Sequence, residues 1–194
     1  MKEKVSAIVL SGGQGRRFGN ADKGLVSWQG KPLIEHVVSR LQRQADQLLI
    51  SCNRNTDDYR LLGFEVFTDL EGGYKGPLAG VQAAANAVMH PWCLLCPNDI
   101  PLLPENLISL LLTALQSTNA QVAYPVCGTR HHFLPALVRS ELLPEVTNYL
   151  QAGGRSLHGW YKNLKVTPVD FTDQDKHFIN VNSPSALSEL SDTI

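Results

Sequence analysis

Short apolar runs alternate with amphipathic segments along the chain up to about residue 118. The apolar runs of strand length are residues 5 to 10, 48 to 52, 65 to 68 and 92 to 96. The segments with apolar residues at helical spacing are residues 32 to 45, 76 to 89 and 104 to 118. Strands that alternate with helices in this way pair mostly in parallel through right-handed crossovers. The pattern therefore predicts an α/β fold.

The pattern changes in the last third of the chain. Residues 121 to 126 and 133 to 138 favour two strands around a loop, which adds an antiparallel insertion to the sheet. The remaining expected segments are two short helices within residues 140 to 162, a strand at 165 to 170, and a terminal helix that Ser183 caps and Pro184 begins. We expect one three-layer α/β/α domain over residues 1 to 194, with a mostly parallel central sheet.

Composition limits the possible partners. The net charge of −1 gives no general field for nucleic acid or for an anionic membrane, so any phosphate affinity must be local. No apolar run approaches the ~20 residues of a membrane span. The first apolar stretch ends at Leu10, which is too short for the core of a signal peptide. We expect a cytoplasmic protein that binds neither nucleic acid nor membrane.

Two of the four cysteines, Cys93 and Cys96, have a spacing that also occurs in zinc and redox sites. They lie, however, within the apolar run 92 to 96, and strand residues three apart point to opposite faces. The two thiols therefore cannot converge on one metal ion. We interpret them as small core residues.

A segment rich in glycine and cations follows the first strand. Residues 11 to 24 read Ser-Gly-Gly-Gln-Gly-Arg-Arg-Phe-Gly-Asn-Ala-Asp-Lys-Gly, and Arg16, Arg17 and Lys23 supply three positive charges. Loops of this kind bind phosphate at the carboxyl end of a first strand. We interpret the segment as a triphosphate-binding loop; the alternative is a solvated turn with incidental charges.

Two common phosphate loops do not match this segment. The Walker A loop needs serine or threonine after its lysine, but Gly24 follows Lys23. The dinucleotide fingerprint, read from Gly13, requires glycine where Phe18 stands, and Asn53 ends the second strand where an acid would bind the ribose. A nicotinamide site is therefore disfavoured.

Asp99 is the most informative acid in the chain. It follows the apolar run 92 to 96, whose carboxyl end should lie at the crevice of the sheet, where ligands of such folds bind. A carboxylate opposite a triphosphate is suited to hold Mg²⁺. The alternative is a cap for the helix that we expect from Pro104, but Asp99 lies too far ahead of that helix to cap it well.

Three further segments are candidates for ligand contact. Glycines in residues 76 to 80 allow close backbone approach at a helix start, although a plain loop-helix junction would look the same. Asn180 and Asn182 alternate with apolar residues, so both amides should leave one face of an extended stretch. Residues 151 to 155 are either a helix stop or a loop on the acceptor side. The adjacent histidines His131 and His132 are by default an exposed loop pair.

Residues 10 to 24 resemble the signature of nucleotidyltransferases with a nucleotide-diphospho-sugar transferase fold, and the variant with two glycines and Asp-Lys-Gly is similar to the molybdenum cofactor guanylyltransferases (MobA-like family). The resemblance covers nearly the whole chain, from Val5 to Pro184. The residues of the loop that carry it are Leu10, Gly12, Gly13, Arg17, Phe18, Gly19, Asp22, Lys23 and Gly24. The other matching segments are Gly76-Pro77-Leu78-Ala79-Gly80, Pro97-Asn98-Asp99-Ile100-Pro101 and Asn180-Val181-Asn182-Ser183-Pro184.

The resemblance implies a Rossmann-like nucleotidyltransferase domain and a distribution of roles over the site. The catalytic residues would be Arg17, Lys23 and Asp99, with Asp99 as the Mg²⁺ ligand. The nucleotide-binding residues would be Leu10, Ser11, Gly12, Gly13, Lys23, Ser51, Asn53, Asp69, Gly80 and Asp99, although the family often has asparagine in place of Ser51. The acceptor-binding residues would be Arg130, His132, Asn180 and Asn182. The family's proline directly after the histidine is missing, because Pro135 lies three places later.

The implied reaction transfers GMP from GTP to the terminal phosphate of molybdopterin and releases pyrophosphate. An ionised phosphate is already a nucleophile, so positioning and charge neutralisation would carry the catalysis. The resemblance also implies transient contacts with proteins of cofactor synthesis and with apo-molybdoenzymes. GTP is expected over CTP and ATP, because close cytidylyl relatives usually show Ala-Gly in place of Gly12-Gly13.

Three alternatives remain at this stage. A cytidylyltransferase or sugar-nucleotidyltransferase would share the loop and the fold. A nucleotide-binding module without turnover would not require the charges of Lys23 and Asp99. A redox or metal-storage role resting on the cysteines is the weakest of the three.

Overall fold

A computed structural model describes residues 3–12, 21–71 and 76–191 of the chain. The strands of the main sheet are β1 (Val5–Leu10), β4 (Gln47–Ser51), β5 (Glu65–Phe67), β6 (Trp92–Pro97), β7 (Val122–Cys127), β8 (Arg130–His131), β9 (Ala136–Arg139) and β10 (Val166–Asp170). Two short strands, β2 (Ser27–Trp28) and β3 (Lys31–Pro32), pair separately with each other. The α-helices are α1 (Leu33–Leu41), α2 (Thr56–Arg60), α3 (Pro77–Ala84), α4 (Leu107–Thr118), α5 (Glu145–Gln151), α6 (Leu157–Tyr161) and α7 (Pro184–Ser191). The 3-10 helices are η2 (Lys23–Leu25), η3 (Ala85–Ala87), η4 (Ser140–Leu142) and η5 (Thr172–Phe178).

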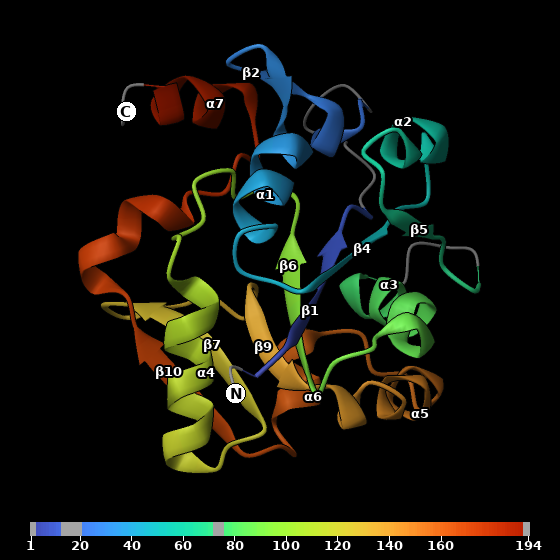
Figure 1. The fold of residues 1–194 in the computed structure, drawn as a ribbon, viewed down its shortest axis with the longest axis vertical. Helices are drawn as coiled ribbons and strands as arrows, with labels where there is room; N and C mark the ends of the chain where they lie inside the picture. Colours follow the sequence, from blue (N-terminus) through green and yellow to red (C-terminus); the bar gives the residue numbers. More distant parts are fainter. Residues whose placement is uncertain (1–2, 13–20, 72–75, 192–194) are drawn as a thin grey trace.

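The main sheet has the strand order β10-β7-β9-β6-β1-β4-β5, and β8 pairs with β7 at its end. Strands β1, β4, β5 and β6 pair in parallel, as do β7 and β10, whereas β9 is antiparallel to both of its neighbours. The prediction of a mostly parallel sheet with an antiparallel insertion is therefore confirmed. Figure 1 shows β1 and β6 running side by side toward the end of the molecule that carries α2, β2 and α7.

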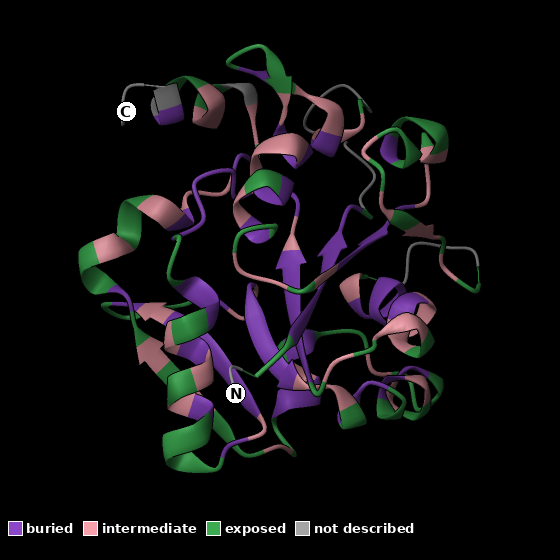
Figure 2. Cartoon of the chain, viewed as in Figure 1, coloured by how far each residue is buried: buried purple, intermediate pink, exposed green. Residues whose placement is uncertain are grey.

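Helices cover both faces of the sheet. One core contains Val5, Ala7 and Val9 of β1 with the apolar faces of α1 and α4. The other contains Ile8 and Leu10 of β1 with α3, α5 and α6. Alternate residues of a strand face opposite sides, so a central strand that is covered twice is apolar throughout. Figure 2 shows the resulting buried centre, and the three-layer expectation is confirmed.

The same alternation separates the two cysteines of β6. Cys93 belongs to the core with α3, α5 and α6, and Cys96 belongs to the core with α1 and α4. The prediction that they do not converge on one site is confirmed. All four cysteines are free and buried.

Several boundaries differ from the sequence prediction. α4 begins at Leu107 and not at Pro104, because Pro104 lies in a turn whose carbonyl accepts from the Leu107 N–H. α1 ends at Leu41, short of residue 45, and α3 ends at Ala84, where a 3-10 turn continues to Ala87. The structure also has α2 in a segment where the sequence analysis expects no helix. With Tyr59 as its one buried residue, α2 has no apolar periodicity to detect.

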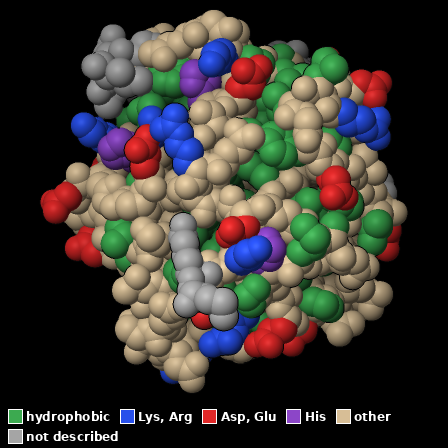
Figure 3. Space-filling view, in the orientation of Figure 1, with side chains coloured by type: hydrophobic (Ala, Val, Ile, Leu, Met, Phe, Trp, Pro, Cys, Tyr) green, Lys and Arg blue, Asp and Glu red, His purple; other side chains and the backbone are tan. Residues whose placement is uncertain are grey.

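The terminal helix begins as expected. The Ser183 hydroxyl accepts from the Ala186 N–H at 3.2 Å, and Pro184 is the first residue of α7. In the described residues, no helix is both long and apolar enough to cross a membrane. Figure 3 shows acidic and basic side chains interspersed over the face of the molecule that it presents, in keeping with the near-zero net charge.

Candidate active site

The candidate site lies where the parallel strands β1, β4 and β6 end. Leu10 is in register with Ser51 of β4 and with Pro97 of β6, so the residues that follow these three strands emerge at one edge of the sheet. They include Gly12, Asn53 and Asp99. Ligands of open α/β sheets bind at this edge, outside the carboxyl ends of the strands.

A lysine connects three segments of the site. The Lys23 ammonium donates to Asp99 Oδ2 at 2.5 Å and to Asn182 Oδ1 at 2.6 Å. The side chains of Lys23 and Asp99 are 20% and 14% exposed, so this ion pair is only partly screened by water. The fold thus brings together the end of the glycine-rich loop, the residues that follow β6, and the segment before α7. All three residues were predicted from the sequence.

Asp22, the residue before Lys23, fixes the main chain at the start of η2 through side-chain hydrogen bonds. Asp22 Oδ1 caps η2 by accepting from the Gly24 N–H at 3.1 Å, and it also accepts from the Tyr59 hydroxyl at 2.7 Å. Asn55 donates to Asp22 Oδ2 at 3.2 Å. A Cβ atom on Gly24 would lie 2.4 Å from the Tyr59 hydroxyl, so glycine is needed there. Asp22 and Tyr59 form a clamp that fixes the start of η2.

The sequence analysis did not predict the Asp22–Tyr59 clamp. Asp22 stood in the motif without an assigned role, and Tyr59 was not singled out at all. Burial and the negative charge of Asp22 raise the pKa of Tyr59, so the phenol stays protonated and donates. The one available indication was an aromatic residue, Tyr59, in the otherwise polar stretch of residues 53 to 60.

The buried oxygens without a hydrogen-bond partner in the described residues include Asp99 Oδ1 and Asn180 Oδ1. The main chain brings these residues close, because the Val181 N–H donates to the Asp99 carbonyl at 2.8 Å. Asp99 does not cap α4, whose cap position is Asn106. Unpaired buried oxygens are costly, and Mg²⁺ prefers oxygen ligands, so this donor set fits the ion that the sequence predicted.

Asn53 and Asp69 form a reciprocal pair between the ends of β4 and β5. Asn53 Nδ2 donates to Asp69 Oδ2 at 2.8 Å, and the Asp69 N–H donates to Asn53 Oδ1 at 2.9 Å. Burial raises the pKa of Asp69, and the bond from Asn53 opposes that shift. The two predicted nucleotide contacts are thus brought together as one rigid unit.

The start of α3 packs tightly against the ends of β1 and β4. A Cβ atom on Gly80 would lie 2.4 Å from Ser51 Oγ and 3.1 Å from Leu10 Cδ2. Leu10, Ser11 and Ser51 are buried, so their side chains pack inside the fold at the ends of β1 and β4. Ser11 is tied to β4 through its N–H, which donates to the Ser51 carbonyl at 2.7 Å. Gly12 is exposed. Gly13 and Arg17 lie outside the described residues.

The loop before α6 approaches the same helix start. Gly76 has φ of 83°, and a Cβ there would lie 3.3 Å from the Arg155 carbonyl. Arg155 itself donates to the carbonyls of Leu150, in the last turn of α5, and of Gly154, which follows that helix. The segment 151 to 155 therefore stops a helix, as one of the two interpretations held, and it also borders the predicted nucleotide site.

The two acceptor candidates near β8 differ in exposure. Arg130 is exposed in the β8 strand, whereas His132 is 5% exposed and packs on Phe178 with a ring-centroid distance of 4.9 Å. Burial and the nearby Arg130 charge lower the pKa of His132, so its imidazole is neutral near pH 7. The default expectation of an exposed histidine pair is wrong for His132 and holds for His131.

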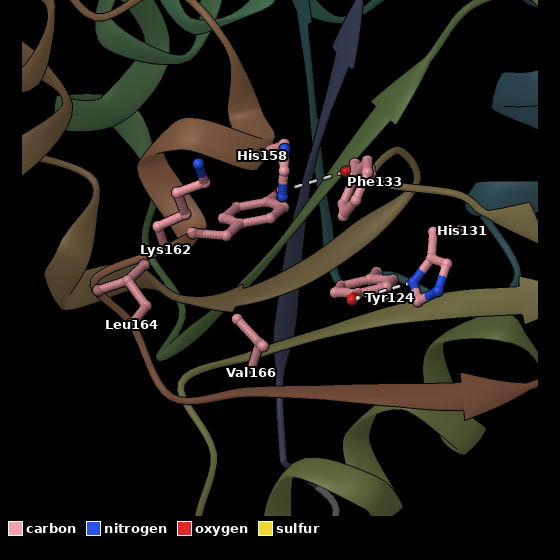
Figure 4. A pocket seen from close by; sticks show the side chains of 8 residues that line it. Tyr124, His131, Phe133, His158, Lys162, Leu164 and Val166 are labelled. Atoms are coloured by element: carbon pink, nitrogen blue, oxygen red, sulfur yellow. Dashed lines mark hydrogen bonds between the residues drawn. The ribbon is translucent and has the colours of Figure 1, made fainter.

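His131 lines a pocket of about 460 Å³, shown in Figure 4. Its ring hydrogen-bonds with the Tyr124 hydroxyl at 3.3 Å, and the ring of Phe133 stacks on that of His158 at 4.8 Å. Tyr161 closes the back, and Lys162 adds a cation. No sequence pattern indicated this aromatic pocket, because its walls come from β7, from β8 and the turn after it, from α6, and from the start of β10.

Comparisons with known proteins agree with this geometry. The family described as the MobA-like NTP transferase domain matches residues 7–166. The molybdenum cofactor guanylyltransferase of Shewanella sediminis is 37% identical over 194 residues, which are all of this chain and 99% of that protein.

Solved structures show the same fold at lower identity. The molybdopterin-guanine dinucleotide biosynthesis protein A of Archaeoglobus fulgidus has a TM-score of 0.78 at 23% identity, and the alignment covers 97% of each chain. The 4-diphosphocytidyl-2C-methyl-D-erythritol synthase of Anaerococcus prevotii has a TM-score of 0.73 at 12% identity and covers 98% of each chain. The fold alone therefore does not select the base. The match over residues 7–166 and the full-length identity of 37% do settle the family: the chain belongs to the MobA-like NTP transferases.

Proposed function

We propose that the protein transfers GMP from GTP to the terminal phosphate of molybdenum-loaded molybdopterin, giving the guanine dinucleotide cofactor and pyrophosphate. The names of the full-length relatives support the base and the acceptor. The structural observation that carries the proposal is the Lys23 ammonium held between Asp99 and Asn182 at the carboxyl edge of the sheet.

The chain's own residues position the reactants. Gly12 is exposed and without a side chain, so its backbone N–H can donate to a phosphate, and Gly13 and Arg17 would add further donors. Lys23 would turn from its resting partners toward the triphosphate. Its charge would then neutralise the negative charge that develops on the leaving pyrophosphate. The Asp22 and Tyr59 clamp keeps the start of η2 in place during that exchange.

Asp99 would hold Mg²⁺ through its unpartnered Oδ1, and Asn180 presents a second buried oxygen. When bound, the ion would supply charge neutralisation at the phosphates. The other carboxylate oxygen of Asp99 accepts from Lys23 before Lys23 turns to the triphosphate, so one acid positions both positive charges at the start of the reaction.

The base and ribose would lie between the reciprocal pair Asn53–Asp69 and the start of α3. Gly80 and Gly76 let the start of α3 approach Ser51 and the Arg155 carbonyl closely, which fixes the position of this wall. The guanine edge carries a carbonyl and an amino group, whereas adenine reverses that pattern and would leave buried polar groups unpaired.

The acceptor would approach from the side of Asn182 and Arg130. Arg130 is exposed and can pair with a phosphate, since a guanidinium binds phosphate oxygens in a fork. The aromatic pocket beside His131 adjoins this strand, and its flat walls suit a planar heterocycle.

Pyrophosphate release tests whether the protein is an enzyme or only a binding module. Full-length protein, GTP and Mg²⁺ should release pyrophosphate when molybdenum-loaded molybdopterin is added, in amounts equal to the dinucleotide formed. GTP binding with no release in the presence of acceptor would contradict the proposal. Release without acceptor would indicate hydrolysis instead of transfer.

A further inference from the structure

Three side chains that can bind metal converge beside the end of β7, on the opposite side of the hairpin from the aromatic pocket. Cys127 ends β7, His132 directly follows β8, and Asp175 lies in η5. Their ligand atoms all lie within 4.8 Å of one another.

Burial makes this cluster more than a chance gathering of surface groups. Cys127 and His132 are 7% and 5% exposed. His132 Nε2 is buried and has no hydrogen-bond partner in the described part of the chain. A buried polar nitrogen left unpaired costs free energy, so native structures rarely keep one without a reason. An ion bound by that nitrogen would supply its missing partner.

Main-chain hydrogen bonds hold the three segments in place. The His132 N–H donates to the Pro125 carbonyl at 2.9 Å, which fixes the hairpin strand. The Phe171 N–H donates to the Val126 carbonyl at 2.8 Å, and the Gly128 N–H donates to Thr172 Oγ1 at 2.9 Å. These bonds tie the start of η5 to the end of β7, so the arrangement is preformed before any ion arrives.

We propose that Cys127, His132 and Asp175 bind a divalent transition-metal ion of the zinc class. A thiolate, an imidazole and a carboxylate are the ligand types that zinc takes, and three protein ligands leave a fourth position for water. The thiolate and the carboxylate together balance the charge of the ion. Asp175 is exposed, so the ion can enter from its side. This site is separate from the Mg²⁺ position proposed at Asp99.

A nucleophilic cysteine is the competing interpretation of the same residues, and the environment argues against it. Burial and the negative charge of Asp175 raise the pKa of Cys127 to about 11, whereas a reactive thiol needs a lowered pKa. His132 is kept neutral, which is the form that ligates metal. On binding, the metal would replace the thiol proton, and that proton would pass to solvent.

Cobalt titration of the metal-stripped full-length protein tests the site, with excess Mg²⁺ present and no nucleotide. We expect one Co²⁺ per chain with a thiolate-to-metal absorption band, proton release on binding, and displacement by Zn²⁺. The Cys127→Ser variant should lose the band, and Asp175→Asn should weaken zinc binding by more than the roughly 10- to 100-fold cost of removing a partner outside the ligand set.

Two control variants make the result specific. Asp173→Asn changes an exposed acid of the same 3-10 helix and should keep the parent affinity, and Asp99→Asn should keep the band because it belongs to the other site. Asp175 is exposed, so its variant should keep the parent circular dichroism. Absence of the band in the parent protein, or parent affinity in Asp175→Asn, would overturn the proposal. Neither result depends on guanylyl transfer, which is measured separately.

Discussion

Replacing Lys23 by alanine should lower turnover far more than nucleotide binding. In the structure the ammonium lies 2.5 Å from Asp99 Oδ2 and 2.6 Å from Asn182 Oδ1, and it would be released to the pyrophosphate as negative charge develops there. Removing one preorganised group that stabilises such charge costs about 2.7–4 kcal/mol, or roughly 10²- to 10³-fold in kcat. The KM for GTP should change much less, because this interaction strengthens only in the transition state.

The same variant should also cost some stability. Breaking a fully buried ion pair costs about 3–5 kcal/mol, whereas an exposed pair contributes roughly 0–1 kcal/mol. The Lys23 side chain is 20% exposed and borders an open site, so we expect a loss of about 1–2 kcal/mol in the free energy of unfolding. That loss is too small to explain a fall in kcat through unfolded protein.

Steady-state kinetics and urea denaturation together separate these effects. Lys31→Ala removes an exposed lysine of β3 and is the matched control, which should leave both measurements unchanged. The reasoning is refuted if Lys23→Ala keeps its turnover. A rise in KM with unchanged kcat would mean that Lys23 binds substrate and transition state equally.

Three further variants test other parts of the site. Asp99→Asn should abolish magnesium-dependent transfer and leave the circular dichroism unchanged, because the amide keeps the shape and lacks the charge; full activity at low Mg²⁺ would remove Asp99 as the metal ligand. Gly80→Ala should lose about 1–3 kcal/mol of stability in urea denaturation and raise the KM for GTP, because its Cβ would meet Ser51 Oγ at 2.4 Å. Adding Ser51→Ala to Gly80→Ala should restore part of the lost stability and lower the KM for GTP again. No recovery of either quantity would contradict the steric explanation. Tyr59→Phe removes a buried donor to the charged Asp22 and should cost about 1.5–3 kcal/mol in the same measurement; parent stability would show that the clamp does not stabilise the fold.

The sequence was sufficient for the layers of the fold because burial on both faces leaves a clear pattern. β1 and β6 are apolar almost throughout, and α1 and α4 repeat apolar residues at helical spacing. α2 was missed because Tyr59 is its single buried residue. A helix held by one side chain and its end contacts has no periodicity to detect.

A residue of the candidate site was predictable where it lies in a recognisable local motif, and not where only the meeting of distant segments gives it a role. Lys23, Asp99 and Asn182 each had a local context that indicated chemistry, and the structure joins them directly. The grouping of Cys127 with Asp175 depends on the pairing of β7 with the segment after β10, which no local pattern encodes. The roles of Gly13 and Arg17 stay predictions, because these residues lie outside the described part of the chain.

Competition between nucleotides tests the central claim most directly. GTP, CTP and ATP at equal concentration are supplied to the full-length protein with Mg²⁺ and molybdenum-loaded molybdopterin, and the products are identified by mass spectrometry. The account predicts that the guanine dinucleotide of the pterin is the main product. A cytosine dinucleotide would contradict the base assignment while leaving the fold and the phosphate chemistry in place. Failure to transfer any nucleotide to the pterin would contradict the proposed function itself.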